Sequence, residues 1–229
     1  MNFAAIETAT EWCSVALWND GEIVSLERRA GPRQGEFVLP MLWRLLERTG
    51  LAVRDLDAIA YGAGPGAFTG LRIACGVAQG LALARGLPLI GISTLEAAAE
   101  DSGATRAFVA LDARMHEVYY AAFDKHADGT GWRTLLPPCC APPDAVEIPP
   151  GEGWLGCGSG FSAYAARIEP RLRGVLERIA PEVRPSAVAV ARLAAPRLVR
   201  GEGVDAAQAA PLYVRDKVAL TSLEQAERK

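Results

Sequence analysis

The chain has 229 residues, of which 50% are hydrophobic and 22% charged, an ordinary composition for a globular protein with a sizeable core. Its net charge of -3 at pH 7 argues against strong independent binding to nucleic acid, because that affinity comes largely from basic side chains on phosphates. Charged residues interrupt every candidate membrane span, and the N-terminus lacks the basic start and long apolar segment of a signal peptide. We therefore expect a cytoplasmic protein without membrane contact.

The cysteines and histidines favour neither a disulfide framework nor a metal site. The five cysteines are an odd number without a Cys-x-x-Cys pair, so reduced thiols are expected. His116 and His126 form no compact cluster in the sequence, and neither lies near Ser14, Ser93 or Ser159 as a hydrolytic triad would suggest. We expect no metal, no cofactor and no hydrolytic triad.

The first hundred residues predict an alternation of strands and helices. Asn19-Asp20-Gly21 is a strong hairpin signal, and Ser93 with Glu96 fits a helix capping box. Gly50 ends an amphipathic helix that carries Pro40 in its first turn. The expected strands span residues 3–7, 12–18, 22–29, 58–62 and 89–92, and the expected helices span residues 38–48 and 69–85, with a short alanine-rich helix after Ser93.

The same order of elements begins again after Ser102. Expected strands span residues 108–112, 118–123, 132–136 and 154–157, and expected helices span residues 162–168 and 186–200, with a proline-rich stretch at 137–150 and a bend or break at Pro196. Two such rounds predict a duplicated α/β fold with subdomains at residues 1–102 and 103–229. We expect the last helix and the tail of the second subdomain to pack back on the first.

The helix expected over residues 69–85 has an unusual outer side. One stripe at helical spacing should pack on the chain's own sheet, namely Gly70, Ile73, Ala74, Val77, Leu81 and Ala84. The other side is small or only moderately polar, and its two glycines each cost about 1 kcal/mol against alanine in a helix. Close approach of another helix, from this chain or from a partner, would offset that cost. The residues on this side are Arg72, Cys75, Gly76, Gln79, Gly80 and Leu83.

Short motifs are spread over nearly the whole chain. They are residues 6–10 (IETAT), 13–17 (CSVAL), 64–73 (GPGAFTGLRI), 79–82 (QGLA), 91–95 (GISTL), 112–115 (DARM), 117–119 (EVY) and 211–215 (PLYVR). Together these motifs resemble those of the TsaB family, also called YeaZ. The similarity is strongest over the first 120 residues, around the glycine-rich loop and the helix after it, and weak over residues 132–200.

The resemblance implies the two-subdomain α/β fold of the actin, sugar kinase and chaperone ATPase superfamily. In that superfamily an acidic residue after the first strand and a nearby hydroxyl turn handle metal and phosphate. Here Glu7 stands where the pattern usually has aspartate, and Ala9 replaces a glycine that would allow close approach to phosphate. Glu7, Thr8, Thr10 and Gly158 are therefore candidates for a weak nucleotide site, with a structural role as the alternative. Residues 64–70 could cradle phosphate or simply turn the chain.

The resemblance also implies a function. TsaB proteins are non-catalytic subunits in the synthesis of threonylcarbamoyladenosine, the modified base next to the anticodon of tRNA. They pair with the transferase TsaD and work with the ATPase TsaE. The His-x-x-x-His metal pair of TsaD does not occur in this sequence, so no catalytic residue is expected. Contact with tRNA would come only through the complex, and the chain alone would form a homodimer.

The expected contact with TsaD is a four-helix one, made by the helices at residues 38–48 and 69–85 and their equivalents in the partner. The alternatives are a stand-alone ATPase or small-molecule kinase of the same superfamily, and a peptidase. The expected interface residues are Leu42, Leu45, Arg72, Cys75, Gly76, Gln79, Gly80 and Leu83.

Overall fold

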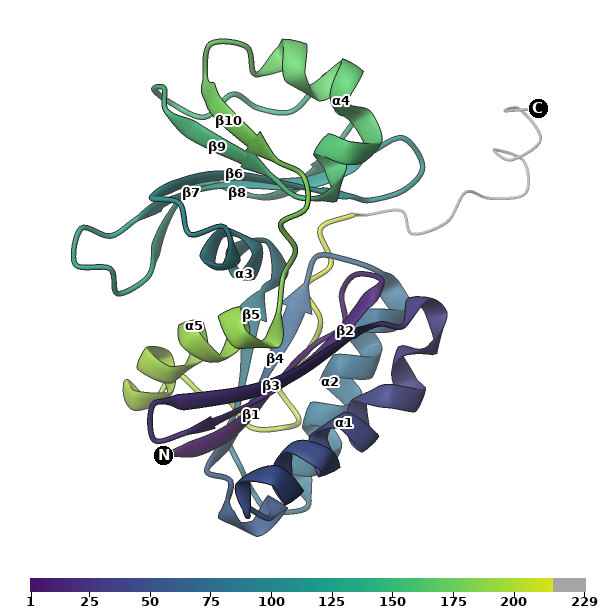
Figure 1. The fold of residues 1–229 in the computed structure, drawn as a ribbon, viewed down its shortest axis with the longest axis vertical. Coiled ribbons are helices and arrows are strands. Elements are labelled where there is room, and N and C mark those ends of the chain that lie inside the picture. The colour runs from purple at the N-terminus through teal and green to yellow at the C-terminus, as the bar shows by residue number, and fades with distance from the viewer. Residues whose placement is uncertain (216–229) are drawn as a thin grey trace.

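A computed structural model describes residues 1–215 of the chain and shows two stacked sheets with helices between and around them (Figure 1). The part of the expected tail that follows residue 215 lies outside the described residues. The elements are β1 (Asn2–Glu7), β2 (Trp12–Asn19), β3 (Glu22–Arg29), α1 (Gln34–Thr49), β4 (Ala58–Gly64), α2 (Phe68–Leu83), β5 (Leu89–Ser93), α3 (Thr94–Asp101), β6 (Arg106–Asp112), β7 (Val118–Lys125), β8 (Trp132–Ala141), β9 (Trp154–Cys157), α4 (Ser159–Arg171), β10 (Leu176–Ala180) and α5 (Ala187–Val199).

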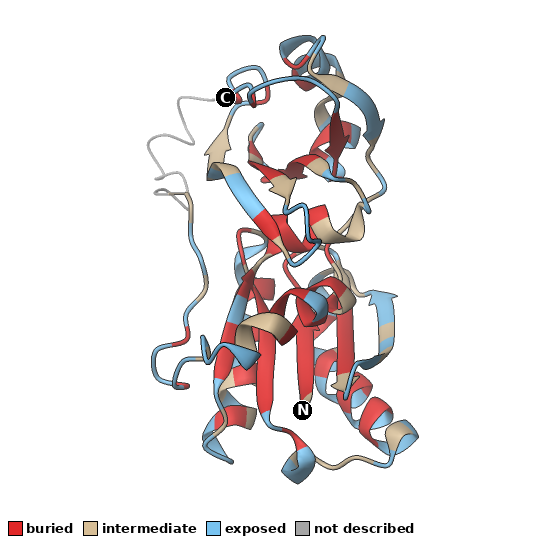
Figure 2. Cartoon of the chain, turned by 90° about the vertical axis from the view of Figure 1, so that its left-hand side faces the viewer, coloured by how far each residue is buried: buried red, intermediate tan, exposed pale blue. Residues whose placement is uncertain are grey.

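The first sheet has the strand order β3-β2-β1-β4-β5, and its two faces bury different sets of side chains. Ala4 and Ile6 of β1 point to the face that α1 and α2 cover, whereas Phe3 and Ala5 point to the opposite face, which α5 covers. Both faces are therefore buried, as Figure 2 shows for the central strands of this sheet. This explains why β1 and β4 read as continuous apolar runs without alternation.

The second sheet repeats the first. Its order is β10-β9-β6-β7-β8, and the strand directions correspond: the first three strands of each repeat are antiparallel, and the fourth and fifth run parallel to the first. The helix that would correspond to α1 is replaced by a loop between β8 and β9. This topology confirms the predicted duplicated fold of the actin, sugar kinase and chaperone ATPase class.

The last helix of each repeat packs against the sheet of the other repeat. α3 contacts β6 and β7 of the second sheet, α5 contacts β1, β2 and β4 of the first sheet, and the two helices also contact each other. Alanines dominate this core, including Ala97 and Ala98 of α3 and Ala191 and Ala194 of α5, all completely buried. Side chains this small allow helices and sheets to approach closely at little cost in side-chain entropy.

Several predicted boundaries are wrong. α1 begins at Gln34, so Pro40 lies inside the helix and not in its first turn. The prolines at residues 137 and 138 belong to β8, and strand β10 was not predicted. α5 continues past Pro196 without a break, and Ala84 is exposed beyond the end of α2. The predicted hairpin turn is confirmed, because Asp20 and Gly21 have φ values of 47° and 100°.

A close contact between two loops fixes the start of α2. We call residues 8–10 the threonine loop and residues 64–70 the glycine loop. Thr8 Oγ1 donates a hydrogen bond of 2.7 Å to the carbonyl oxygen of Gly70, and a Cβ added to Gly70 would lie 1.9 Å from the carbonyl oxygen of Thr8. The Cβ position is fixed by the backbone of Gly70, and the oxygen belongs to the backbone of Thr8. The two loops would therefore have to separate to admit a side chain at Gly70.

We therefore predict that Gly70→Ala destabilises the fold by about 3 kcal/mol, at the upper end of overpacking costs. Chemical denaturation of the purified variant measures this. Gly35→Ala is the matched control, because its new Cβ would meet only the Cδ1 atom of Ile73 at an ordinary 3.7 Å. Equal stability of the two variants would contradict the proposed packing of the two loops.

Candidate functional site

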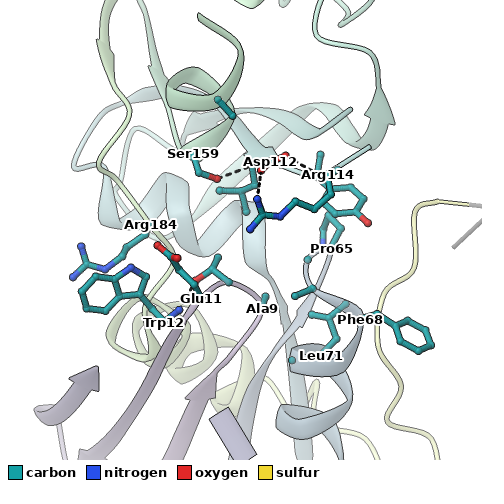
Figure 3. A pocket seen from close by; sticks show the side chains of 18 of the residues that line it. Ala9, Glu11, Trp12, Pro65, Phe68, Leu71, Asp112, Arg114, Ser159 and Arg184 are labelled. Atoms are coloured by element: carbon teal, nitrogen blue, oxygen red, sulfur yellow. Dashed lines mark hydrogen bonds and ion pairs between the residues drawn. The ribbon is translucent and has the colours of Figure 1, made fainter. Parts of the chain in front are cut away.

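A cleft of about 1120 Å³ lies between the two sheets at the ends of β1 and β6, and Figure 3 shows its walls. The threonine loop and the glycine loop form its floor, and the end of β6 with the start of α4 forms the opposite wall. In sequence, the main lining segments are residues 9–12, 65–71, 111–115, 181–184 and 212–215.

Glu7, the first candidate for nucleotide binding, lies outside this lining. Its side chain is 1% exposed, and its Oε1 accepts a hydrogen bond of 2.6 Å from the amide of Ala9, while Thr94 Oγ1 lies 3.3 Å from its Oε2. A Cβ at Gly62 would lie 1.9 Å from the same Oε2, so this glycine makes room for the carboxyl group. Burial raises the pKa of Glu7 to about 7. Glu7 therefore joins β1, β4 and α3 and does not reach into the cleft.

Thr8 is also withdrawn from the cleft. It is completely buried, and its hydroxyl is engaged with Gly70. The amide of Ala67, at the start of α2, donates a hydrogen bond of 2.7 Å to the carbonyl oxygen of Ala9, and a Cβ at Gly66 would lie 2.5 Å from that oxygen. The Ala67 amide, just before α2, is therefore taken by the protein's own backbone and is not free for a phosphate. This supports the structural role for the glycine loop.

Of the two remaining candidates for nucleotide binding, Thr10 lines the cleft and Gly158 does not. The Oγ1 of Thr10, however, accepts a hydrogen bond of 3.2 Å from the amide of Trp12, and Gln34 donates to the carbonyl oxygen of Thr10. Gly158 precedes α4 with a φ of 103°, and an added Cβ would lie 2.4 Å from the carbonyl oxygen of Ala110. Gly158 therefore serves the packing of α4 onto β6.

Asp112, at the end of β6, organises the opposite wall. Its Oδ1 accepts hydrogen bonds from the hydroxyl of Tyr164 at 3.0 Å and from the amide of Arg114 at 2.7 Å, and its own amide donates to Ser159. Its Oδ2 lies 3.1 Å from the guanidinium of Arg114 (Figure 3). The charge of this arginine is therefore already balanced by a carboxylate.

The other arginines of the cleft are paired as well. Arg184 stacks over Trp12, with its Cζ 4.1 Å from the ring centroid, and pairs with Glu27 at 2.7 Å. Arg215 pairs with Glu117, the residue before β7. A phosphate entering this cleft would therefore have to compete with carboxylates for each of these cations.

Within residues 1–215, no group of three or more His, Cys, Asp or Glu side chains is placed to hold a metal ion. In the same part of the chain, no helix is both long enough and apolar enough to cross a bilayer.

The expected interface residues divide into two groups, which corrects the sequence-based interpretation. Leu42 and Leu45 are completely buried, and Cys75 is 4% exposed, so all three belong to the core beneath α1 and α2. Of the stripe expected to pack inward on α2, Gly70 and Ala74 are buried, whereas the remaining members are only half-buried or, at Ala84, exposed. Arg72, Gly76, Gly80 and Leu83 do lie on the exposed side of α2, whereas Gln79 is half-buried and bonded to the chain's own C-terminal segment.

The exposed side of α1 carries apolar residues that were not predicted. Leu39 is 37% exposed and Trp43, one helical turn later, is 49% exposed. α1 and α2 lie side by side, with Gly35 close to Ile73. We call the exposed sides of these two helices the outer face. The spacing of Leu39 and Trp43, four residues apart within the helix predicted at residues 38–48, could have revealed this.

Comparisons with known proteins identify relatives along the whole chain. A model of the TsaD family, described as tRNA N6-adenosine threonylcarbamoyltransferase, matches residues 30–148. The tRNA threonylcarbamoyladenosine biosynthesis protein TsaB of Escherichia coli K12 is 38% identical over 97% of this chain and 98% of its own length. TsaB of Haemophilus influenzae is 33% identical over 95% of both chains.

A solved structure agrees with these sequence matches. YeaZ from Pseudomonas aeruginosa superposes with a TM-score of 0.85 at 37% identity, covering 93% of this chain and 99% of that one. With the motifs and the duplicated fold, these matches show that the chain belongs to the TsaB (YeaZ) family of tRNA threonylcarbamoyladenosine biosynthesis proteins.

Proposed function

We propose that this protein is a non-catalytic subunit required for threonylcarbamoyladenosine modification of tRNA, and that it acts by pairing with the transferase TsaD in a complex that also includes the ATPase TsaE. The observation that carries the proposal is the outer face. There, α2 has Gly76 and Gly80 at exposed positions one turn apart, with Leu83 78% exposed beside them.

The monomer offers no packing reason for these two glycines. A Cβ added to Gly76 or Gly80 would meet no atom within 4 Å among the described residues. Each glycine nevertheless costs about 1 kcal/mol against alanine in the middle of a helix. Close approach of a partner helix would offset that cost, and the exposed Leu39 and Trp43 of α1 would supply apolar contact beside it.

The match to the TsaD family model supports TsaD as that partner. The matched residues, 30–148, include the whole of α1 and α2. A TsaD chain with an equivalent pair of helices could meet this pair about a pseudo-twofold axis, forming a four-helix contact. In the absence of TsaD, the same face would serve a homodimer by the same geometry.

The geometry of the cleft supports a non-catalytic role. Glu7 and Thr8 are buried and bonded within the protein, and the backbone of Ala9 takes the amide that begins α2. The alternative, a stand-alone ATPase or small-molecule kinase, would need these groups on a nucleotide. Nucleotide turnover by the isolated protein with magnesium separates the two functions, and brisk turnover would support the alternative.

Reconstitution provides the direct test of the proposed function. We expect purified TsaD, TsaE, threonylcarbamoyl adenylate and tRNA to give modified tRNA only when this protein is added, because TsaD would need this subunit for its active arrangement. Mass spectrometry of the digested tRNA measures the product. Full modification without the protein would overturn the proposal.

Substitution of Gly80 tests the outer face. We predict that Gly80→Ala raises the unfolding free energy of the monomer by 0.5 to 1 kcal/mol, roughly the helix-propensity difference. Gly80→Lys should abolish association with TsaD while leaving the circular dichroism spectrum unchanged. Val199→Lys is the control, because this 78% exposed side chain lies on α5, across the first sheet from α2. Association of Gly80→Lys at the native affinity would refute the outer face as the contact.

Glu7 gives a prediction about pH. The pKa of Glu7 is raised from 4.5 to about 7 in the folded protein, so the folded state binds this proton more tightly than the unfolded chain. Its contribution to stability is present below about pH 4.5 and is lost as the pH rises to 7, by about 3 kcal/mol in total. Glu7→Gln keeps the acceptor for Ala9 and should escape this loss.

The measurement is the unfolding free energy of both proteins at about pH 5 and pH 8. The unfolding free energy of Glu7→Gln should increase relative to that of the native protein as the pH rises. Asp101, whose pKa burial also raises to about 6, titrates in both proteins and largely cancels in the comparison. A constant difference across this range would show that Glu7 is ionised throughout and accessible to solvent or ligand.

A further inference from the structure

The C-terminal part of the described chain, residues 204–215, runs back along the first sheet without forming a helix or strand (Figure 2). We call it the strap. It starts at the edge of β5, where Val204 and Leu89 exchange two backbone hydrogen bonds of 2.7 and 2.8 Å. It then follows α2, where the side-chain amide of Gln79 donates to the carbonyl oxygens of Ala206 and Ala209.

The next residues of the strap are held against the end of β4. The hydroxyl of Tyr61 donates to the carbonyl oxygen of Ala210 at 3.1 Å, and the amide of Leu212 donates to Ala63 at 2.7 Å. A Cβ at Gly64 would lie 2.8 Å from the carbonyl oxygen of Leu212. The absence of a side chain at Gly64 therefore lets the strap pack closely against the glycine loop. The conformational entropy of this segment is therefore already lost in the folded protein.

At its end the strap joins α2 through an exposed stack of three side chains. Arg72 lies with its Cζ 3.8 Å from the centroid of the Phe68 ring, and its Nε donates 3.1 Å to the hydroxyl of Tyr213. The rings of Phe68 and Tyr213 are 5.6 Å apart. Phe68 is 39% and Tyr213 46% exposed, although large aromatic side chains ordinarily bury more of their surface.

We propose that the strap is the third element of the docking surface for the transferase partner, with Tyr213 as its aromatic anchor. This inference rests on the proposed function, because it extends the outer face of that proposal. The stack is continuous with that face: Arg72 lies one helical turn before Gly76 on the exposed side of α2. Tyrosine and arginine are enriched among the residues that dominate binding energy at protein interfaces.

The charges of the surface indicate what the partner presents. Within residues 1–215, Arg72 contacts an aromatic ring and a hydroxyl but pairs with no carboxylate. Arg44 and Arg48 are further exposed cations on α1. The occupant that fits is therefore a helical, apolar surface of the transferase that carries a carboxylate opposite Arg72.

The experiment measures the dissociation constant of the full chain with purified transferase by calorimetry, and self-association by sedimentation. We expect Tyr213→Ala to weaken binding to the transferase at least tenfold and Tyr213→Phe to weaken it less, because the ring remains while the acceptor for Arg72 is lost. Ile148→Ala is the control, because this 46% exposed side chain lies between β8 and β9 of the second repeat.

The outcomes separate this inference from the function on which it rests. If Tyr213→Ala binds the transferase normally while Gly80→Lys does not, the strap is no part of the surface and the proposed function stands. If Tyr213→Ala weakens only self-association, the strap serves the homodimer and the inference is wrong. If neither substitution affects binding, the outer face itself is refuted. Unchanged melting temperatures confirm that each variant is folded.

Discussion

The positions of the cleft and of the outer face depend on the alanine-rich contact between α3 and α5. Each helix belongs to one repeat of the sequence and packs on the sheet of the other repeat, so neither sheet can move away without exposing a shared core. Polar contacts reinforce the packing of α3 against α5: Glu96 of α3 pairs with Arg197 of α5, and the hydroxyl of Ser186 donates to Asp101 at 3.1 Å. The back of the cleft is therefore closed by packed helices.

The duplicated fold uses the same backbone contact twice, once at the floor of the cleft and once at the opposite wall. In each repeat, the helix after the fourth strand begins with glycines that rest on the backbone at the end of the first strand, Gly70 on Thr8 and Gly158 on Ala110. In the first repeat, the amide of Ala67 just before α2 also donates to the carbonyl oxygen of Ala9.

The two faces of the first sheet have separate tasks. The inner face, with α5, joins the repeats, whereas α1, α2 and the strap border the opposite side and expose their apolar groups to solvent in the isolated chain. α2 itself has two sides: Ala74 and Ala78 face the sheet, and Gly76 and Gly80 face outward. A partner on this side would contact a helix whose position the sheet already fixes.

The sequence alone determined the order of strands and helices except for β10, as well as the duplication and the family, because hydrophobic periodicity, turn residues and local motifs are properties of short segments. It also placed Gly76 and Gly80 on the exposed side of α2. It also placed Gly70 on the inner side of the same helix, but only the structure shows that a Cβ on Gly70 would lie 1.9 Å from backbone, whereas a Cβ on Gly80 would meet nothing within 4 Å. Only the tertiary structure decided that Leu42, Leu45 and Cys75 are core, that Glu7 turns away from the cleft and that Gln79 holds the strap, because those roles depend on neighbours distant in the sequence.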